Sequence, residues 1–96
     1  RRPALVLSNP AFQEQSGYLL LAMVTSARNS QWPTDWQIKD LQAAGLPQSC
    51  VVRFKVFTLD QSLLIGCLGA LSEADRRGVQ SRLLEVVALS PVDPKP

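Results

Sequence analysis

The apolar positions of the chain gather in short runs of the length of β-strands. Residues 4–8 form the first run, which ends at Asn9-Pro10, a dipeptide typical of turns. Residues 18–25 form the second run. It is apolar at every position but the last, so both faces of this strand should be covered. The polar residues 11–16 between the two runs predict a loop.

Two more strands are expected in the middle of the chain. Residues 34–38 alternate between apolar and polar side chains, which predicts a third strand. Residues 40–48 contain a Gly-Leu-Pro sequence and predict a connection. Residues 49–59 are rich in β-forming residues, and their alternation predicts one apolar face and an opposite face that carries Arg53 and Lys55.

The C-terminal third predicts one strand and one helix. Residues 63–70 predict a last strand, in which two glycines mark a bulge or a tight bend. Ser72, with Asp75 three residues later, resembles a capping box and predicts the start of a helix. Apolar residues continue at helical spacing to Val87. Residues 90–96 contain three prolines and predict a flexible tail.

Together these elements predict a mainly β protein. The 96 residues provide one domain with a modest core, which we expect at residues 1–89. It should contain four or five short antiparallel strands and one terminal helix. Small sheets of this kind close or half-close into barrels, because closure removes their exposed edges. No apolar run is long enough to cross a membrane.

The composition excludes several kinds of chemistry. The chain has no histidine, so it cannot form a Ser-His-Asp or Cys-His nucleophile or a histidine acid–base pair. Its two cysteines, Cys50 and Cys67, lie within apolar runs and are expected to be buried free thiols in a reducing cytoplasm. Two separated cysteines do not make a zinc site, and we expect no metal or other cofactor.

The charge pattern says more than the net charge. A net charge of +2 is too small to indicate a nucleic-acid partner by itself. Five basic residues nevertheless lie in or beside the predicted strands, which would make a local basic surface: Arg1, Arg2, Arg28, Arg53 and Lys55. The alternative is that these charges are only solvated.

One pair of residues suggests a chemical site. If residues 4–8 and 18–25 form neighbouring antiparallel strands, Arg2 and Thr25 meet at the same end of the sheet. An arginine binds phosphate oxygens with two parallel hydrogen bonds, and a threonine hydroxyl donates to a phosphoryl oxygen or relays a proton. RNA carries its own nucleophile, the 2′-hydroxyl, so a chain without histidine can still cleave RNA, although this pair does not supply the general base. The alternative is an ordinary exposed arginine beside a β-forming threonine.

Two tryptophans also leave alternatives open. Trp32 and Trp36 could stack on bases of a nucleic acid, or they could pack in the core or at an interface.

Four motifs in order resemble the MazF/PemK family, the toxins of bacterial toxin–antitoxin pairs. They are Arg2-Pro3-Ala4-Leu5-Val6-Leu7-Ser8, the Thr25-Ser26 pair, Phe57-Thr58-Leu59-Asp60, and a Gly-x-Leu before the C-terminal helix. The resemblance spans residues 1 to about 88. It implies a small SH3-like antiparallel barrel with a C-terminal α-helix. Members of the family also carry an earlier strand and a substrate-gripping loop before the Arg-Pro pair, which the printed sequence lacks.

The resemblance also implies an activity. Such a toxin is a sequence-specific, metal-independent endoribonuclease that cleaves single-stranded RNA, including mRNA, and leaves 2′,3′-cyclic phosphate and 5′-hydroxyl ends. Arg2 and Thr25 match the catalytic residues of the family. Arg53 is the nearest match to a basic RNA contact of some members, and we add Lys55 from the same predicted strand and Ser26 and Arg28 from the neighbouring loop.

The implied partners are a cognate antitoxin protein, single-stranded RNA and a second copy of the chain in a homodimer. An alternative is a non-catalytic binding module like CcdB, which shares the barrel and acts on a protein target. A plain structural SH3-like domain is the third reading.

Overall fold

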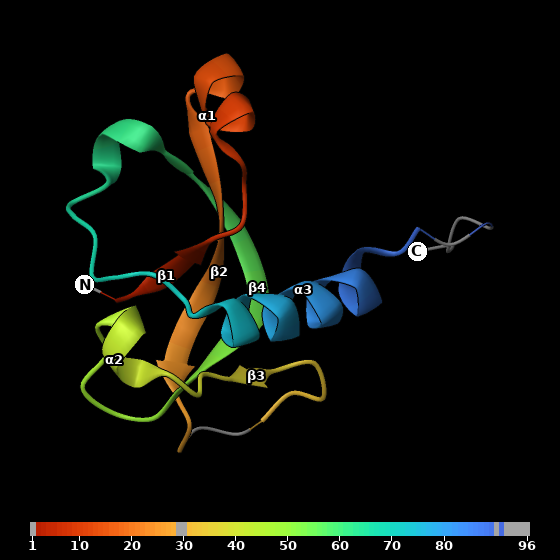
Figure 1. Cartoon of the computed structure of the whole chain (residues 1–96). Helices are drawn as coiled ribbons and strands as arrows, with labels where there is room; N and C mark the ends of the chain where they lie inside the picture. Colours follow the sequence, from red (N-terminus) through yellow and green to blue (C-terminus); the bar gives the residue numbers. More distant parts are fainter. Residues whose placement is uncertain (1, 29–30, 90, 92–96) are drawn as a thin grey trace.

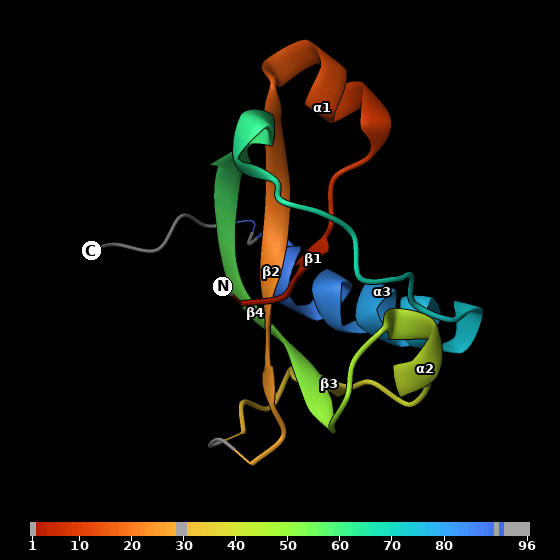
Figure 2. The ribbon, with the colours of Figure 1, turned by 90° about the vertical axis from the view of Figure 1, so that its left-hand side faces the viewer.

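The chain folds around a four-stranded antiparallel sheet. The computed structural model describes residues 2–28, 31–89 and 91. Within them the strands follow the order β1 (Ala4–Val6), β2 (Tyr18–Ser26), β4 (Cys50–Asp60) and β3 (Trp36–Gln37). The long strands β2 and β4 run side by side through the molecule, and the short β1 and β3 flank them (Figures 1 and 2). The predicted mainly β, SH3-like architecture with a C-terminal helix is confirmed, in the form of a curled half-barrel.

The prediction of a loop at residues 11–16 is wrong. Helix α1 occupies Pro10–Ser16. The Asn9 side chain accepts a hydrogen bond from the backbone N–H of Phe12 at 2.9 Å, Pro10 supplies the preset first turn, and Gly17 ends the helix in the left-handed conformation. An Asn-Pro pair is typical of turns and also of helix starts, and here it starts a helix.

The predicted strand at residues 63–70 is also absent. A short 3-10 turn, η1 (Gln61–Leu63), is followed by a segment that joins no strand, and the side chains of residues 61–70 are exposed. This segment packs its backbone against α2 (Leu41–Ala44), a short helix in the predicted connection. A Cβ atom at Gly69 would lie 2.4 Å from the carbonyl oxygen of Ala43, so the contact requires glycine and replaces pairing in the sheet.

Strand β4 carries an irregularity that bends the sheet. Ala22 of β2 pairs with Val56, but the next residue, Met23, pairs with Arg53, so Phe54 and Lys55 have no partner on β2. Such bulges increase the local twist of a strand. The bend separates a buried half of β4 from an exposed half, and the change begins at Lys55.

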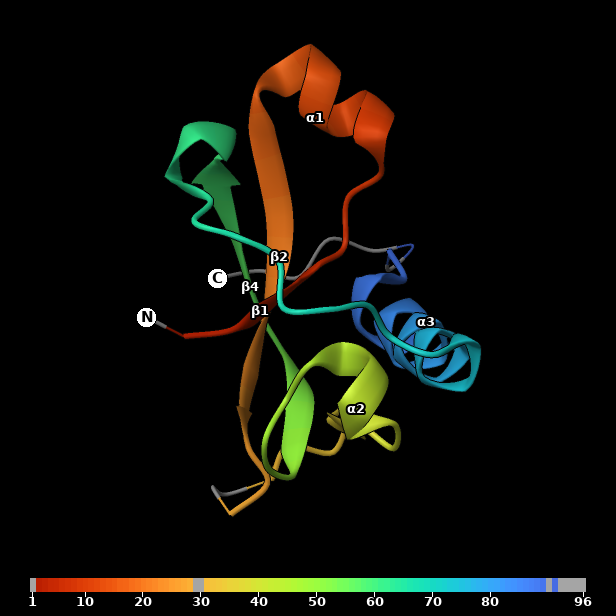
Figure 3. The ribbon, with the colours of Figure 1, turned by 60° about the vertical axis from the view of Figure 1, so that its left-hand side comes forward.

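The core lies between the sheet and α3 (Glu73–Val87), which begins at the predicted cap, Ser72 (Figure 3). Its buried members come from β2, β4, α2, α3 and the segment after β3: Ala22, Val24, Ile38, Ala44, Cys50, Val52, Phe54 and Val79. Only the first part of the apolar face of α3 joins the core, since Val79 is buried but Val86 and Val87 are exposed.

Three further expectations concern the cysteines, membrane-spanning helices and the C-terminal tail. Cys50 is buried and free as predicted, whereas Cys67 is free but exposed. No helix in the described part of the chain is long and apolar enough to cross a membrane. The predicted tail, residues 90–96, lies outside the described residues except for Pro91.

Helix α3 meets the sheet edge through an unusually close contact. A Cβ atom at Gly78 would lie 2.2 Å from the ring of Trp36, so only glycine lets the helix approach this far. The indole Nε1 of Trp36 donates a hydrogen bond to the Asp75 carboxylate at 2.9 Å. Glycine in the middle of a helix costs about 1 kcal/mol relative to alanine, which this packing must offset.

The Asp75 carboxylate is fully buried and accepts several hydrogen bonds. Besides the Trp36 indole, the donors are the backbone N–H groups of Lys39 and Asp40, at 3.0 Å each, and the Ser72 hydroxyl at 3.2 Å. Burial alone would raise the pKa of Asp75, but these hydrogen bonds outweigh it and lower the pKa below its ordinary value. The group therefore stays ionised inside the protein.

Replacing this acceptor should destabilise the fold. Asp75→Asn puts an NH₂ group among N–H donors, so at least one buried donor loses its partner, and the free energy of unfolding should fall by about 1–3 kcal/mol. Because the folded pKa lies below the unfolded value near 3.8, the contribution of Asp75 is complete above that pH and is lost as the pH falls through the folded pKa.

Urea unfolding at neutral and acidic pH checks this prediction. The acid-induced loss of stability should be smaller in Asp75→Asn than in the original chain. Asp40→Asn is the matched control, because Asp40 caps α2 through its side chain and asparagine caps equally well. Equal stability of the two variants would contradict the role given to Asp75.

Candidate functional site

The sheet brings Arg2 and Thr25 together. Strand β1 pairs with β2 in the register Ala4 to Met23, and the N–H of Val24 donates to the carbonyl of Pro3 at 3.3 Å, which extends the ladder beyond β1. One more step places Arg2 opposite Thr25. Residues opposed in an antiparallel ladder share a face of the sheet. Arg2 is exposed and Thr25 is half-buried, so the continued ladder puts both residues on one face at the end of the sheet.

Two of the other candidates leave from the same end of β2. Ser26 is the last residue of the strand, and its hydroxyl accepts a hydrogen bond from the N–H of Arg28 at 3.2 Å. This contact shapes the turn that follows Thr25. Arg28 is exposed, and residues 29–30 after it lie outside the described residues. Ser26 and Arg28 thus lie next to the Arg2–Thr25 pair, as expected for a loop beside a site.

Arg53 has a different setting from the one expected. Its guanidinium binds the Asp35 carboxylate through two hydrogen bonds, Nε to Oδ1 at 3.1 Å and Nη2 to Oδ2 at 2.7 Å. The two side chains are only 8% and 6% exposed. The guanidinium carbon also lies 5.2 Å from the centre of the Trp32 ring. With only 8% of its side chain exposed, Arg53 offers little surface for a direct contact with RNA.

The pair fixes the charges of both residues. Burial would raise the pKa of Asp35, but the hydrogen bond from Arg53, the backbone N–H of Trp32 and the charge of Arg53 together lower it. The hydrogen bond with Asp35 raises the pKa of Arg53, against a smaller opposite effect of burial. Since both groups stay ionised, their charges cancel locally, and neither contributes much to the field outside.

Lys55 lies apart from the Arg2–Thr25 pair. It is exposed in the unpaired part of β4, whereas Val51 is the residue that pairs with Thr25. Four residues along a strand correspond to roughly 13 Å. The structure therefore groups Arg2, Thr25, Ser26 and Arg28, and leaves Lys55 at a distance.

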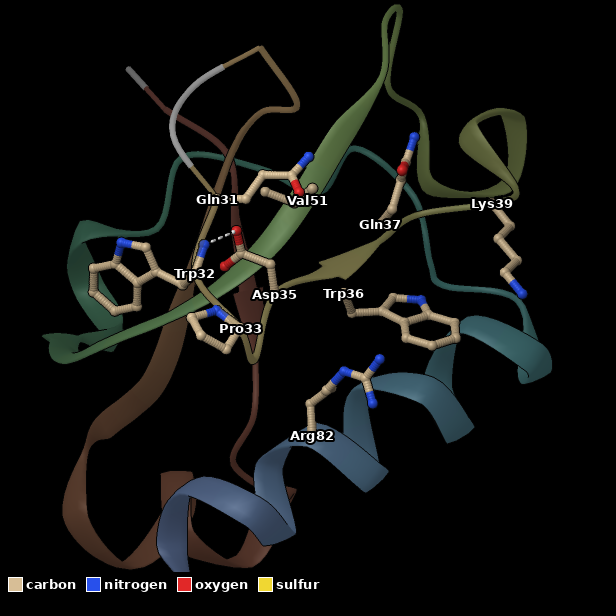
Figure 4. Close-up of a pocket in the computed structure, with 9 residues that line it drawn as sticks. All are labelled: Gln31, Trp32, Pro33, Asp35, Trp36, Gln37, Lys39, Val51 and Arg82. Carbon is tan, nitrogen blue, oxygen red and sulfur yellow. Dashed lines mark hydrogen bonds between the residues drawn. The ribbon is translucent and has the colours of Figure 1, made fainter.

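A pocket of about 540 Å³ opens beside the edge strand β3. Figure 4 shows its lining, which comes from the loop before β3, from β3 itself, from β4 and from α3: Gln31, Trp32, Pro33, Asp35, Trp36, Gln37, Lys39, Val51 and Arg82. Val51 of β4 pairs with Thr25 of β2 on one side and with Gln37 of β3 on the other, so the three residues form one row across the sheet. The pocket is thus a neighbour of the Arg2–Thr25 pair.

Three charged residues of this pocket belong to no motif in the sequence: Asp35, Lys39 and Arg82. Lys39 and Arg82 place their charged ends over the Trp36 ring, at 5.1 and 5.6 Å from its centre. Asp35 pairs with a residue 18 positions away, and no local spacing signals such a contact. In the described part of the chain, no group of three or more His, Cys, Asp or Glu side chains is placed to hold a metal ion.

Comparison with known proteins gives consistent matches in fold. The chain is similar to the toxin MazF-mt6 of Mycobacterium tuberculosis, with a TM-score of 0.76 and 19% identity over 93% of this chain and 88% of the other. A MazE-MazF structure from Deinococcus radiodurans gives a TM-score of 0.73 and 26% identity, over 94% and 88%. A mycobacterial endoribonuclease in complex with its cognate antitoxin gives 0.75 and 21%, over 99% and 84%. No curated protein matches the chain.

The sequence itself matches one family profile. This profile, described as the PemK-like, MazF-like toxin of type II toxin-antitoxin system, covers residues 1–87. Because the match spans nearly the whole chain and agrees with the observed fold, the protein belongs to the PemK-like, MazF-like toxins of type II toxin–antitoxin systems.

Proposed function

We propose that this toxin is an endoribonuclease that cleaves single-stranded RNA, such as mRNA, at short specific sequences. The observation that carries the proposal is the ladder position that sets Arg2 opposite Thr25 at an exposed edge of the sheet. Two of the similar structures support it, since each is named an endoribonuclease of mycobacterial origin.

The chemistry follows from these two side chains and from RNA itself. The 2′-oxygen attacks the adjacent phosphorus and loses its proton, the bond from phosphorus to the 5′-oxygen breaks, and that oxygen takes up a proton. The products are a 2′,3′-cyclic phosphate and a 5′-hydroxyl. Arg2 stabilises the extra negative charge on the phosphoryl oxygens, and the Thr25 hydroxyl donates to one of them. Neither role needs a metal ion.

The neighbouring polar residues would bind the rest of the substrate. Ser26 and Arg28 follow Thr25 directly and would contact the RNA backbone, with Arg28 supplying a charge. Lys55, farther along β4, would contact a more distant phosphate. Arg53 would act indirectly, because its ion pair with Asp35 fixes the loop before β3.

The same toxin is proposed to bind a cognate antitoxin and a second copy of itself. MazE-MazF structures from Deinococcus radiodurans support the first partner. For the second, large apolar side chains are exposed on the second half of β4 and the segment after it: Val56, Phe57, Leu63, Leu64, Ile65 and Leu68. Exposed apolar surface of this extent marks interaction sites, so we place the homodimer contact there.

Catalysis by Arg2 and Thr25 is testable by substitution. Arg2→Ala and Thr25→Val should each reduce RNA cleavage by about 100- to 1000-fold, the effect of removing one preorganised donor to a transition state. Arg2→Lys should recover only part of the activity, because an ammonium lacks the two-pronged geometry. Melting temperatures should hardly change, since Arg2 is exposed and valine keeps the shape of threonine.

The measurement is digestion of mixed RNA in EDTA, with the 5′-hydroxyl ends mapped. Arg76→Ala is the matched control, because Arg76 is an exposed arginine on α3. Near-original cleavage by Arg2→Ala would refute the assignment. A folded protein that cleaves no RNA at all would favour the CcdB-like binding module.

The homodimer is testable through the exposed apolar segment. Leu63→Asp should shift the protein from dimer to monomer at micromolar concentration in sedimentation velocity, because it would bury a charge in the contact. Leu84→Asp on α3 is the matched control, since the two leucines are 62% and 60% exposed. A chain that is already a monomer before substitution would argue against the dimer.

A further inference from the structure

The two tryptophans of this chain lie in different settings. Trp36 is half-buried, its indole N–H is bonded to Asp75, and two cations lie over its ring. These contacts explain Trp36 as packing between the sheet edge and α3. Trp32 is 41% exposed, and in Figure 4 its ring points away from Trp36 and Arg82. Packing of the core does not explain Trp32.

Trp32 lies on the same face of the sheet as Thr25. Its ring is 5.2 Å from the Arg53 guanidinium, and Arg53 pairs with Met23 of β2. Met23 is two residues before Thr25, and side chains two residues apart on a strand point to the same face. The indole is therefore a neighbour of the row that contains Arg2, Thr25 and Val51.

Several contacts hold this exposed ring in place. The backbone N–H of Trp32 donates to the Asp35 carboxylate at 3.0 Å, and the N–H of Asp35 donates back to the Trp32 carbonyl at 3.0 Å. The Asp35 carboxylate is in turn fixed by Arg53. The proline that follows Trp32 limits the backbone further. These contacts fix the backbone that carries the ring, and the Arg53 guanidinium lies over the ring itself.

The charges beside the ring are balanced, and cations line the rest of the pocket. Arg53 cancels the charge of Asp35, so the carboxylate does not repel phosphates. Two cations, Lys39 and Arg82, line the other side of the same pocket, around Trp36, where Arg82 also pairs with Glu85 at 3.5 Å. An exposed aromatic ring in one groove with cations is a usual means of binding single-stranded nucleic acid, because bases stack on the ring while the cations attract the backbone.

We propose that Trp32 is a stacking platform for an unpaired base of the RNA, next to the phosphate held at Arg2 and Thr25. This inference rests on the proposed function and names a residue that selects unpaired RNA. Arg53 and Asp35 are positioning residues, which keep the indole in place and touch no substrate. A base in a duplex is stacked on its neighbours and cannot reach the ring, so the platform favours single strands.

The test uses a random-sequence 2′-O-methyl RNA, which lacks the attacking hydroxyl and so binds without being cleaved. Because the chain has only two tryptophans, the emission of Trp32 is the difference between the original protein and Trp32→Phe. We expect this emission to change on binding. An abasic 2′-O-methyl strand, which keeps the phosphates but has no bases, should leave it unchanged.

The affinity of each variant for the 2′-O-methyl RNA is the second measurement. Trp32→Ala should weaken binding of the probe by roughly 5- to 100-fold, the effect of losing one stacked base, and Trp32→Phe should retain most of the affinity. The salt dependence of binding should be the same in both variants, since phosphate contacts are untouched. Phe12→Ala is the matched control, because Phe12 is also 41% exposed but lies on α1.

The outcomes separate this inference from the proposed function. If Trp32→Ala binds the probe and cleaves unmodified RNA as the original protein does, the stacking platform is refuted and the nuclease stands. The same holds if the abasic strand changes the emission as much as the full strand. If the original protein neither binds nor cleaves RNA, both proposals are refuted.

Discussion

The buried carboxylate of Asp75 joins β3, the segment before α2 and the start of α3 through hydrogen bonds. It accepts hydrogen bonds from the Trp36 side chain on β3, from the N–H groups of Lys39 and Asp40 before α2, and from the cap of α3. Strand β3 has only two residues, so its own ladder cannot fix it firmly. Burying an ionised carboxylate costs free energy unless hydrogen-bond donors replace the lost water. This cost favours the one arrangement in which all the donors reach Asp75. The sheet edge beside the proposed site depends on this one group.

The second buried acid, Asp35, is stabilised in another way. Neutral donors surround Asp75, whereas Asp35 is bound by a guanidinium and so forms a true ion pair. Replacing such a pair with apolar residues of similar volume is often neutral or even stabilising, so stability alone does not explain it. Its position does, because it lies under an exposed indole and next to the Arg2–Thr25 row. Asp75 thus fixes the sheet edge at β3, whereas Asp35 positions the exposed Trp32 side chain.

The parts of the fold that depend on local pattern could be predicted from the sequence. The apolar run of β2, the β-rich run of β4 and the serine cap of α3 each carry a strong signal of their own. Antiparallel geometry alone led to the prediction that Arg2 and Thr25 meet, and the observed register of β1 and β2 runs in the direction that this prediction needs. Their roles in catalysis stay a prediction.

The parts that failed depend on contacts between distant residues or on ambiguous signals. An Asn-Pro pair fits both a turn and a helix start, and only the glycine at position 17 distinguishes them. The segment 63–70 has strand composition, but the backbone contact at Gly69 takes it past α2 instead. A contact between distant residues also limits which substitutions the chain can accept, as at Gly78 and Trp36. Because a methyl group at position 78 has no room beside the indole, alanine there requires either a smaller side chain at position 36 or a shift of α3 away from the sheet edge, so substitutions at the two positions are coupled.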